Sequence, residues 1–199
     1  MSDDARGPSQ SPRWPLWVFL STLLTATLLR LFLARMARHP GPADFSFYFI
    51  VARNMANGRG PVLDVVGQFL YDPQALPCYA NDYWMPMASW VMSLFLRTAG
   101  DSLFVALIPS MICGTALGVL SLFAGRLVSN SWSVGLCAGA IVLVLPPLLK
   151  YSLVTDGAIY YACWVGAGLL ALMMARRSGP GMPSTAPLGE GSDARRSSD

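Results

Sequence analysis

Two aspartates stand beside the ends of long apolar segments and are the residues best suited to chemistry. Asp44 lies in HPGPADFSFYFIVARN, just after the first apolar run, and Asp156 lies in YSLVTDGAIYYACW, just before the last one. A positioned carboxylate can take a proton from an attacking hydroxyl group. The pair predicts acid–base chemistry if the fold brings both residues to the same side of the chain.

Both aspartates also have a simpler explanation. Aspartate is a favoured N-cap residue, and a helix is expected to begin directly after each of them. Capping accounts for Asp44 or Asp156 taken singly. The catalytic interpretation therefore depends on the two acids lying together.

Basic side chains near these acids are candidates for binding a phosphate group. Arginine suits bidentate contacts with phosphate, and lysine supplies a point charge. The candidates are Arg53, Arg59 and Lys150, with His39 and Arg97 as further positive groups. Contact with a lipid headgroup is the ordinary explanation for any one of them. His39 is a weak metal ligand, because only carboxylates accompany it.

The composition places these residues in a membrane protein. Of 199 residues, 54% are hydrophobic and 13% are charged, whereas about a quarter are charged in soluble domains. A membrane span needs about 20 apolar residues in a helix. Four segments meet this requirement, at 14–34, 102–125, 132–149 and 157–175. The predicted fold class is an all-α membrane protein with four transmembrane helices.

The arginines predict the orientation of these spans. With four spans, one side of the membrane holds Arg6, Arg13, Arg126, Arg176 and Arg177. The positive-inside rule makes that side cytoplasmic. Residues 35–101 then form an outer loop, and Asp44 and Asp156 both face outward. Arg30 is expected to extend its side chain toward the outer headgroups.

The remaining segments complete the predicted organisation. Residues 1–13 form a cytoplasmic N-terminus, residues 14–177 the membrane module, and residues 178–199 a cytoplasmic tail whose Gly, Pro and Ser content predicts disorder. In the outer loop, we expect juxtamembrane helices lying in the interface, one beginning at Asp44 and one over 84–96. Two GxxxG motifs, at 114–118 and 135–139, predict close helix packing within the chain.

The order of these features resembles the GT-C glycosyltransferases, in particular the protein O-mannosyltransferase and aminoarabinose transferase group. In that family, the first outer loop carries an acid near its start, then a Tyr, an Ala-Arg pair and a Gly. A second aspartate precedes the fourth span. The matching residues are Asp44, Tyr48, Ala52, Arg53, Gly58 and Asp156.

The resemblance implies transfer of a sugar from a polyprenyl-phosphate donor to an acceptor at the outer face of the plasma (inner) membrane. Asp44 would be the catalytic acid or base. Asp156 would position the substrate or hold a divalent metal ion. Together with the basic residues Arg53, Arg59 and Lys150 chosen for their charge, Tyr48 completes the set expected to bind the substrate or its phosphate. Family members carry further spans, so this chain corresponds to their N-terminal part, and a partner chain would supply the other helices.

Two other functions remain open. The chain could be a truncated, non-catalytic membrane scaffold or assembly subunit, in which both aspartates only cap helices. A transporter is disfavoured, because transport pathways commonly need ionisable residues at mid-span. The predicted spans have none there, since Arg30 lies near the end of its span. Nucleic acid is not an expected partner, since the net charge is only +3 and the arginines are scattered.

Overall fold

The computed structural model describes residues 14–41, 44–65, 75–80 and 86–178, and these are mostly helical. Three helices are long and apolar enough to cross a membrane. They are α1 (Trp14–Met36), α4 (Leu103–Ser129) and α7 (Ala158–Ser178). Their number and length indicate a membrane protein, as the composition predicted.

The segment predicted as a single span over 132–149 is divided into two shorter helices. Helix α5 covers Trp132–Val144, and α6 covers Pro146–Tyr151. The break falls at Leu145, whose ψ of 120° is extended rather than helical. Pro146 and Pro147 explain it, since a proline disfavours helical geometry in the residue before it and has no N–H to donate. The 13 residues of α5 rise only about 20 Å.

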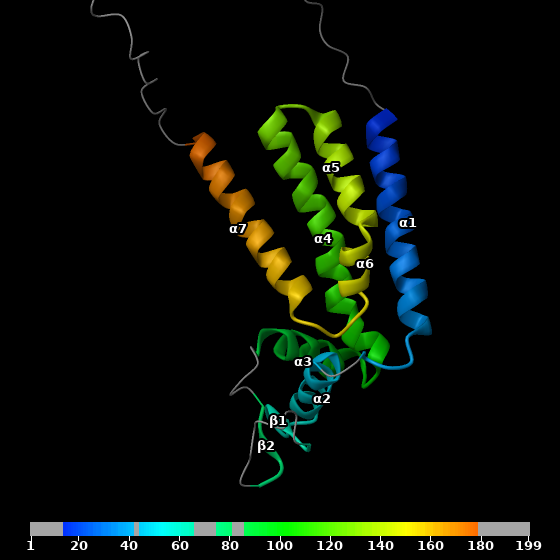
Figure 1. The fold of residues 1–199 in the computed structure, drawn as a ribbon, viewed down its shortest axis with the longest axis vertical. Helices are drawn as coiled ribbons and strands as arrows, with labels where there is room; N and C mark the ends of the chain where they lie inside the picture. The colour runs from blue at the N-terminus through cyan, green and yellow to red at the C-terminus, as the bar shows by residue number, and fades with distance from the viewer. Residues whose placement is uncertain (1–13, 42–43, 66–74, 81–85, 179–199) are drawn as a thin grey trace, which may run out of the picture.

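The long helices run side by side, and the segment between α1 and α4 lies at one end of them (Figure 1). That segment contains two helices, α2 (Asp44–Ala56) and α3 (Met87–Ala99). It also contains a two-stranded antiparallel sheet of β1 (Val62–Leu63) and β2 (Cys78–Tyr79). A helix beginning at Asp44 was predicted and is confirmed. The small sheet was not expected in an all-α fold.

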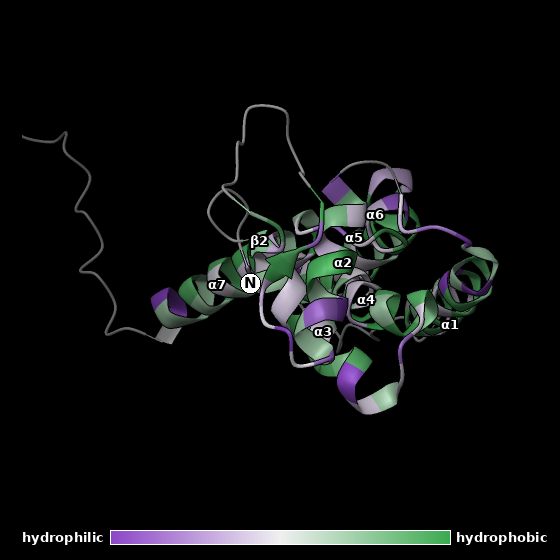
Figure 2. Cartoon of the chain, turned by 90° about the horizontal axis from the view of Figure 1, so that it is seen from below, coloured by the Kyte–Doolittle hydropathy of each residue, from purple (hydrophilic) through white to green (hydrophobic). Residues whose placement is uncertain are grey.

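The first and last described residues lie at the opposite end of the helices from α2 and α3. Figure 1 shows the start of α1 and the end of α7 at that far end. Figure 2 shows α7 as mainly hydrophobic along its length, and its last turn carries Arg176 and Arg177. The predictions for residues 1–13 and for the tail beyond Ser178 fall outside the described residues.

Helix α4 is the centre of the packing, with α1, α3, α5 and α7 against it. Glycines permit its close approach to α5. A Cβ added to Gly139 would lie 2.7 Å from the carbonyl oxygen of Gly118, and one added to Gly135 would lie 2.6 Å from the carbonyl oxygen of Leu122. The predicted packing of both GxxxG motifs within the chain is confirmed.

Candidate functional site

The structure brings Asp44 and Asp156 to one place through the residues next to them. Thr155 is fully buried, and its hydroxyl donates a 2.6 Å hydrogen bond to the carbonyl oxygen of Phe45. Phe45 follows Asp44 in the first turn of α2, and Thr155 precedes Asp156 just before α7. We call this meeting of residues 44–48 with residues 155–157 the α2–α7 junction.

Tyr48 lies one helical turn after Asp44 and faces the other half of the junction. A Cβ added to Gly157 would lie 3.4 Å from the Tyr48 hydroxyl oxygen and 3.1 Å from the Tyr161 ring. Burial raises the pKa of Tyr48 to about 12, with further contributions from the negative charge of Asp156, from Tyr161 and from the negative charge of Asp44. The Tyr48 hydroxyl is therefore protonated at neutral pH and can donate a hydrogen bond.

The two carboxylates have different surroundings. The half-buried Asp156 accepts a 2.6 Å hydrogen bond from the backbone N–H of Gly157 through Oδ1, which fixes the carboxylate beside the start of α7. Asp44 is exposed, and no hydrogen bond or ion pair joins it to another described residue. Asp44 is the carboxylate more accessible to a substrate.

Arg53 lies on the same helix as Asp44 but in its last turn. Nine residues of helix separate the two Cα atoms by about 13 Å. The Arg53 Nε donates a 2.7 Å hydrogen bond to Asp101, and both side chains are exposed. The structure thus places this predicted phosphate ligand away from the α2–α7 junction and pairs it with an acid.

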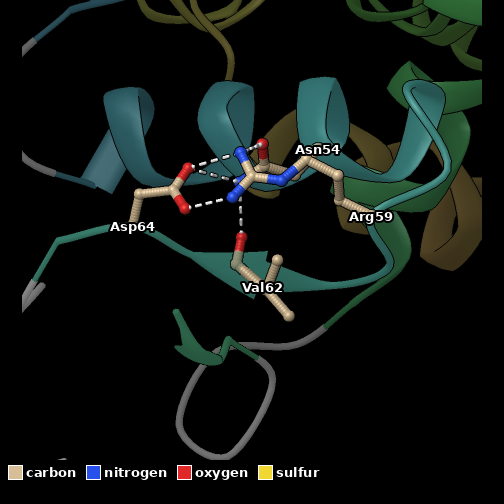
Figure 3. Close-up of polar contacts among 4 residues, drawn as sticks. All are labelled: Asn54, Arg59, Val62 and Asp64. Carbon is tan, nitrogen blue, oxygen red and sulfur yellow. Dashed lines mark hydrogen bonds and ion pairs between the residues drawn. The ribbon is translucent and has the colours of Figure 1, made fainter. Parts of the chain in front are cut away.

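Arg59 is also paired with an acid (Figure 3). Its guanidinium donates hydrogen bonds to both carboxylate oxygens of Asp64, one of them 2.8 Å long, and a 3.1 Å bond to the side-chain oxygen of Asn54. The pairing raises the pKa of Arg59 and lowers that of Asp64. Asn54 in turn donates to the carbonyl oxygen of Val62 at 2.8 Å. This cluster connects the end of α2 to β1.

Two other positive candidates lie in segments that lead into the junction. Lys150 is exposed on α6, six residues before Asp156, with its Nζ 5.9 Å from the Tyr151 ring centre. His39 precedes Pro40, whose carbonyl oxygen lies 3.4 Å from the Thr155 hydroxyl. Of the predicted phosphate ligands, Lys150 is on the element nearest to Asp156 along the chain.

The donor atoms at the junction do not form a metal site by themselves. Within the described parts of the chain, no group of three or more His, Cys, Asp and Glu residues could hold a metal ion. The junction offers the carboxylates of Asp44 and Asp156. A divalent ion there would need most of its oxygen ligands from substrate phosphate or water.

The sequence did not predict the contacts of two residues near the junction. Thr155 was not considered, although a hydroxyl next to an aspartate is a usable signal for a loop contact. The expectation that Arg30 reaches the headgroups is wrong, because its side chain is 0% exposed. Its guanidinium instead donates hydrogen bonds to the Ser152 hydroxyl and to the carbonyl oxygens of Leu143 and Ala26. An arginine inside an apolar span, combined with a Pro-Pro pair in another span, was the available signal.

Comparison with known proteins adds no relative. No family model, no curated protein and no solved structure matches the chain. The resemblance to the GT-C glycosyltransferases therefore depends on the order of residues in this sequence, and the geometry of the α2–α7 junction is the basis for assigning a function.

Proposed function

We propose that the chain is a polyprenyl-phosphate-dependent glycosyltransferase, or the N-terminal half of one, and that the α2–α7 junction is its active site. The observation that carries this proposal is the Thr155–Phe45 hydrogen bond, which holds Asp44 and Asp156 at one junction although they lie in distant parts of the sequence. The resemblance in sequence order leads to the same two acids.

The proposed reaction transfers the sugar in a single displacement. Asp44 accepts the proton of the acceptor hydroxyl, and the hydroxyl oxygen attacks the anomeric carbon of the donor. The bond between that carbon and the phosphate oxygen breaks, and its electron pair leaves with the polyprenyl phosphate. Configuration at the anomeric carbon is inverted. The protonated Tyr48 hydroxyl and Asp156 orient the substrate, and Lys150 offers positive charge to the phosphate.

We also propose four membrane crossings, with α5 and α6 together forming the third of them. Their 19 residues would rise about 28 Å if aligned, close to the hydrocarbon thickness of about 30 Å. The positive-inside rule then places both termini in the cytoplasm and the α2–α7 junction at the outer face of the plasma (inner) membrane.

Thiol labelling tests this orientation. Cys78 is buried, so a better probe is Val65→Cys, at a position 52% exposed, with the native cysteines replaced by alanine. An impermeant thiol reagent should label it in intact cells. Labelling only after permeabilisation would contradict the orientation.

The transfer reaction is tested with protein reconstituted in lipid vesicles. The donors are polyprenyl-phosphate mannose, glucose and aminoarabinose, each radiolabelled, with total membrane protein and lipid as acceptors. We expect transfer from one donor, its loss in Asp44→Asn, and its retention in the matched control Asp101→Asn. Transfer by Asp44→Asn at the wild-type rate would contradict the assignment of Asp44.

A non-catalytic scaffold or assembly subunit is the second candidate function. It is favoured by the hydrogen bond from the Gly157 N–H to Asp156, which serves the start of α7, and by the pairing of Arg53 and Arg59 with acids of the same chain. Absence of transfer from all three donors, together with normal folding of Asp44→Asn and Asp156→Asn, would favour this candidate.

A further inference from the structure

The break between α5 and α6 leaves a backbone carbonyl without its usual donor. In a continuous helix, the carbonyl oxygen of Leu143 would accept a hydrogen bond from the N–H of residue 147. Residue 147 is a proline and has no N–H. Inside a bilayer there is no water to replace that donor, and leaving the carbonyl unsatisfied is strongly unfavourable. Another group must supply the hydrogen bond.

Arg30 of α1 supplies it. One terminal nitrogen of its guanidinium donates a 3.0 Å hydrogen bond to the carbonyl oxygen of Leu143, and its Nε donates a 3.0 Å bond to the Ser152 hydroxyl. The other terminal nitrogen donates to the carbonyl oxygen of Ala26 at 3.2 Å. The side chain is fully buried. A planar guanidinium reaches three acceptors in different directions, which a lysine ammonium on a flexible stem does less well.

The charge of Arg30 is balanced by helix ends. The ion pairs among the described residues are Arg53–Asp101 and Arg59–Asp64, and neither includes Arg30. Leu143 lies in the last turn of α5, and Ser152 is the C-cap residue of α6. The free carbonyl groups at a helix C-terminus carry partial negative charge. Arg30 thus places its positive charge against the C-terminal ends of two helices at once.

Helix α4 provides the space for this arrangement. A Cβ added to Gly114 would lie 2.6 Å from the Ser152 Cβ and 3.6 Å from the Arg30 Nε. One added to Gly118 would lie 2.5 Å from the Leu143 side chain. The two glycines of the first GxxxG motif therefore admit the two residues of α5 and α6 that Arg30 binds.

We propose that Arg30 is a positioning residue that replaces the donor missing at Pro147 and sets the course of the chain from α6 into the α2–α7 junction. Ser152, which Arg30 holds, stands three residues before Thr155, and Thr155 holds the junction through Phe45. Arg30 therefore acts on Asp156 through the turn between α6 and α7. Its role in packing is independent of any reaction, whereas its effect on catalysis rests on the proposed function.

The test compares Arg30 variants in two backgrounds of the full chain. In Pro146→Ala/Pro147→Ala, the backbone N–H groups are restored and the carbonyl of Leu143 can be satisfied within its own helix. Arg30→Met should lower the midpoint of thermal unfolding clearly in the wild-type background and less in the double-alanine background. Equal losses in both backgrounds would overturn the proposal. If Arg30→Met does not fold, recovery of folded protein in the double-alanine background supports it, and failure of recovery overturns it.

Hydrogen–deuterium exchange supplies the local measurement. Arg30→Gln keeps polar atoms but cannot serve the same three acceptors. It should accelerate exchange in residues 148–157, while residues 87–99 of α3 serve as the internal reference. Uniform acceleration in both segments would show a general loss of stability and contradict a positioning role.

Activity separates this inference from the proposed function. If transfer is found, Arg30→Gln should lower kcat more than it raises KM, because the donor still binds but Asp156 is displaced. Absent transfer together with a clear difference between the two backgrounds would count against the enzyme and leave the role of Arg30 intact. Transfer in the wild type without that difference would count against Arg30 alone.

Discussion

The hydroxyl of Thr155 and the carbonyl oxygen of Phe45 are joined by a hydrogen bond of 2.6 Å across 110 residues of sequence. This contact connects the start of α2 to the segment before α7, and Tyr48 lies against the same segment. The Arg30 hydrogen bonds position the preceding turn. The candidate site is therefore built where elements from both halves of the chain meet.

Replacing Thr155 with valine should weaken the α2–α7 junction. Valine keeps the shape of the side chain but has no hydroxyl, so the carbonyl of Phe45 loses its bond from Thr155. Because this carbonyl still accepts the helical hydrogen bond of α2, we expect a loss in the free energy of unfolding of about 0.5–1.5 kcal/mol, the usual net contribution of one hydrogen bond. Chemical denaturation in detergent measures it. Thr155→Ser keeps the hydroxyl and should lose less, so equal losses would show that the hydrogen bond is not the cause.

Tyr48 should make stability depend on pH in the alkaline range. Below pH 10, the phenol is protonated in both the folded and the unfolded chain. Between the ordinary tyrosine pKa of 10.0, which applies to the unfolded chain, and the folded pKa of about 12, the unfolded chain releases the proton and the folded chain keeps it. Stability therefore falls as pH rises through this window. Unfolding curves of the wild type and Tyr48→Phe should diverge there.

Asp156→Asn provides the complementary change. Removing this negative charge lowers the pKa of Tyr48, since the charge of Asp156 contributes to its elevation. The pH window over which stability falls should then end at a lower pH. A window identical to that of the wild type would mean that Asp156 and Tyr48 are not close in solution.

The sequence predicted the parts of this structure that depend on local patterns. Continuous apolar runs indicated the three long helices, and Asp44 marked the start of α2 correctly. Contacts between distant residues could not be predicted in this way. Arg30 was assigned to the headgroups because the pattern of one segment does not reveal the acceptors in another. The positions of Arg53 and Arg59 likewise depend on Asp101 and Asp64, which only the folded chain brings near them.

Two glycines on different helices should respond oppositely to alanine. In Gly118→Ala, the new methyl group would meet the fully buried Leu143 side chain at 2.5 Å, so we expect a loss of about 1–3 kcal/mol from overpacking. In Gly168→Ala, nothing lies within 4 Å of the new group. Alanine should there stabilise α7 by up to about 1 kcal/mol. Thermal unfolding followed by tryptophan fluorescence measures both. Similar changes would contradict the packing of α4 against α5.

Oxidative cross-linking should connect α4 and α7 within one chain. Cys113 on α4 and Cys163 on α7 are neighbours and pack against the same core cluster. A disulfide needs Cα atoms about 4.4–6.8 Å apart, and neighbouring thiols on packed helices can meet this requirement after small movements. Copper phenanthroline should therefore produce a Cys113–Cys163 disulfide, identified by peptide mass spectrometry without reduction. Cys137, exposed on α5, is the internal control and should remain unpaired within the chain. A preference of Cys163 for a second copy of the chain would contradict the packing of α7 against α4.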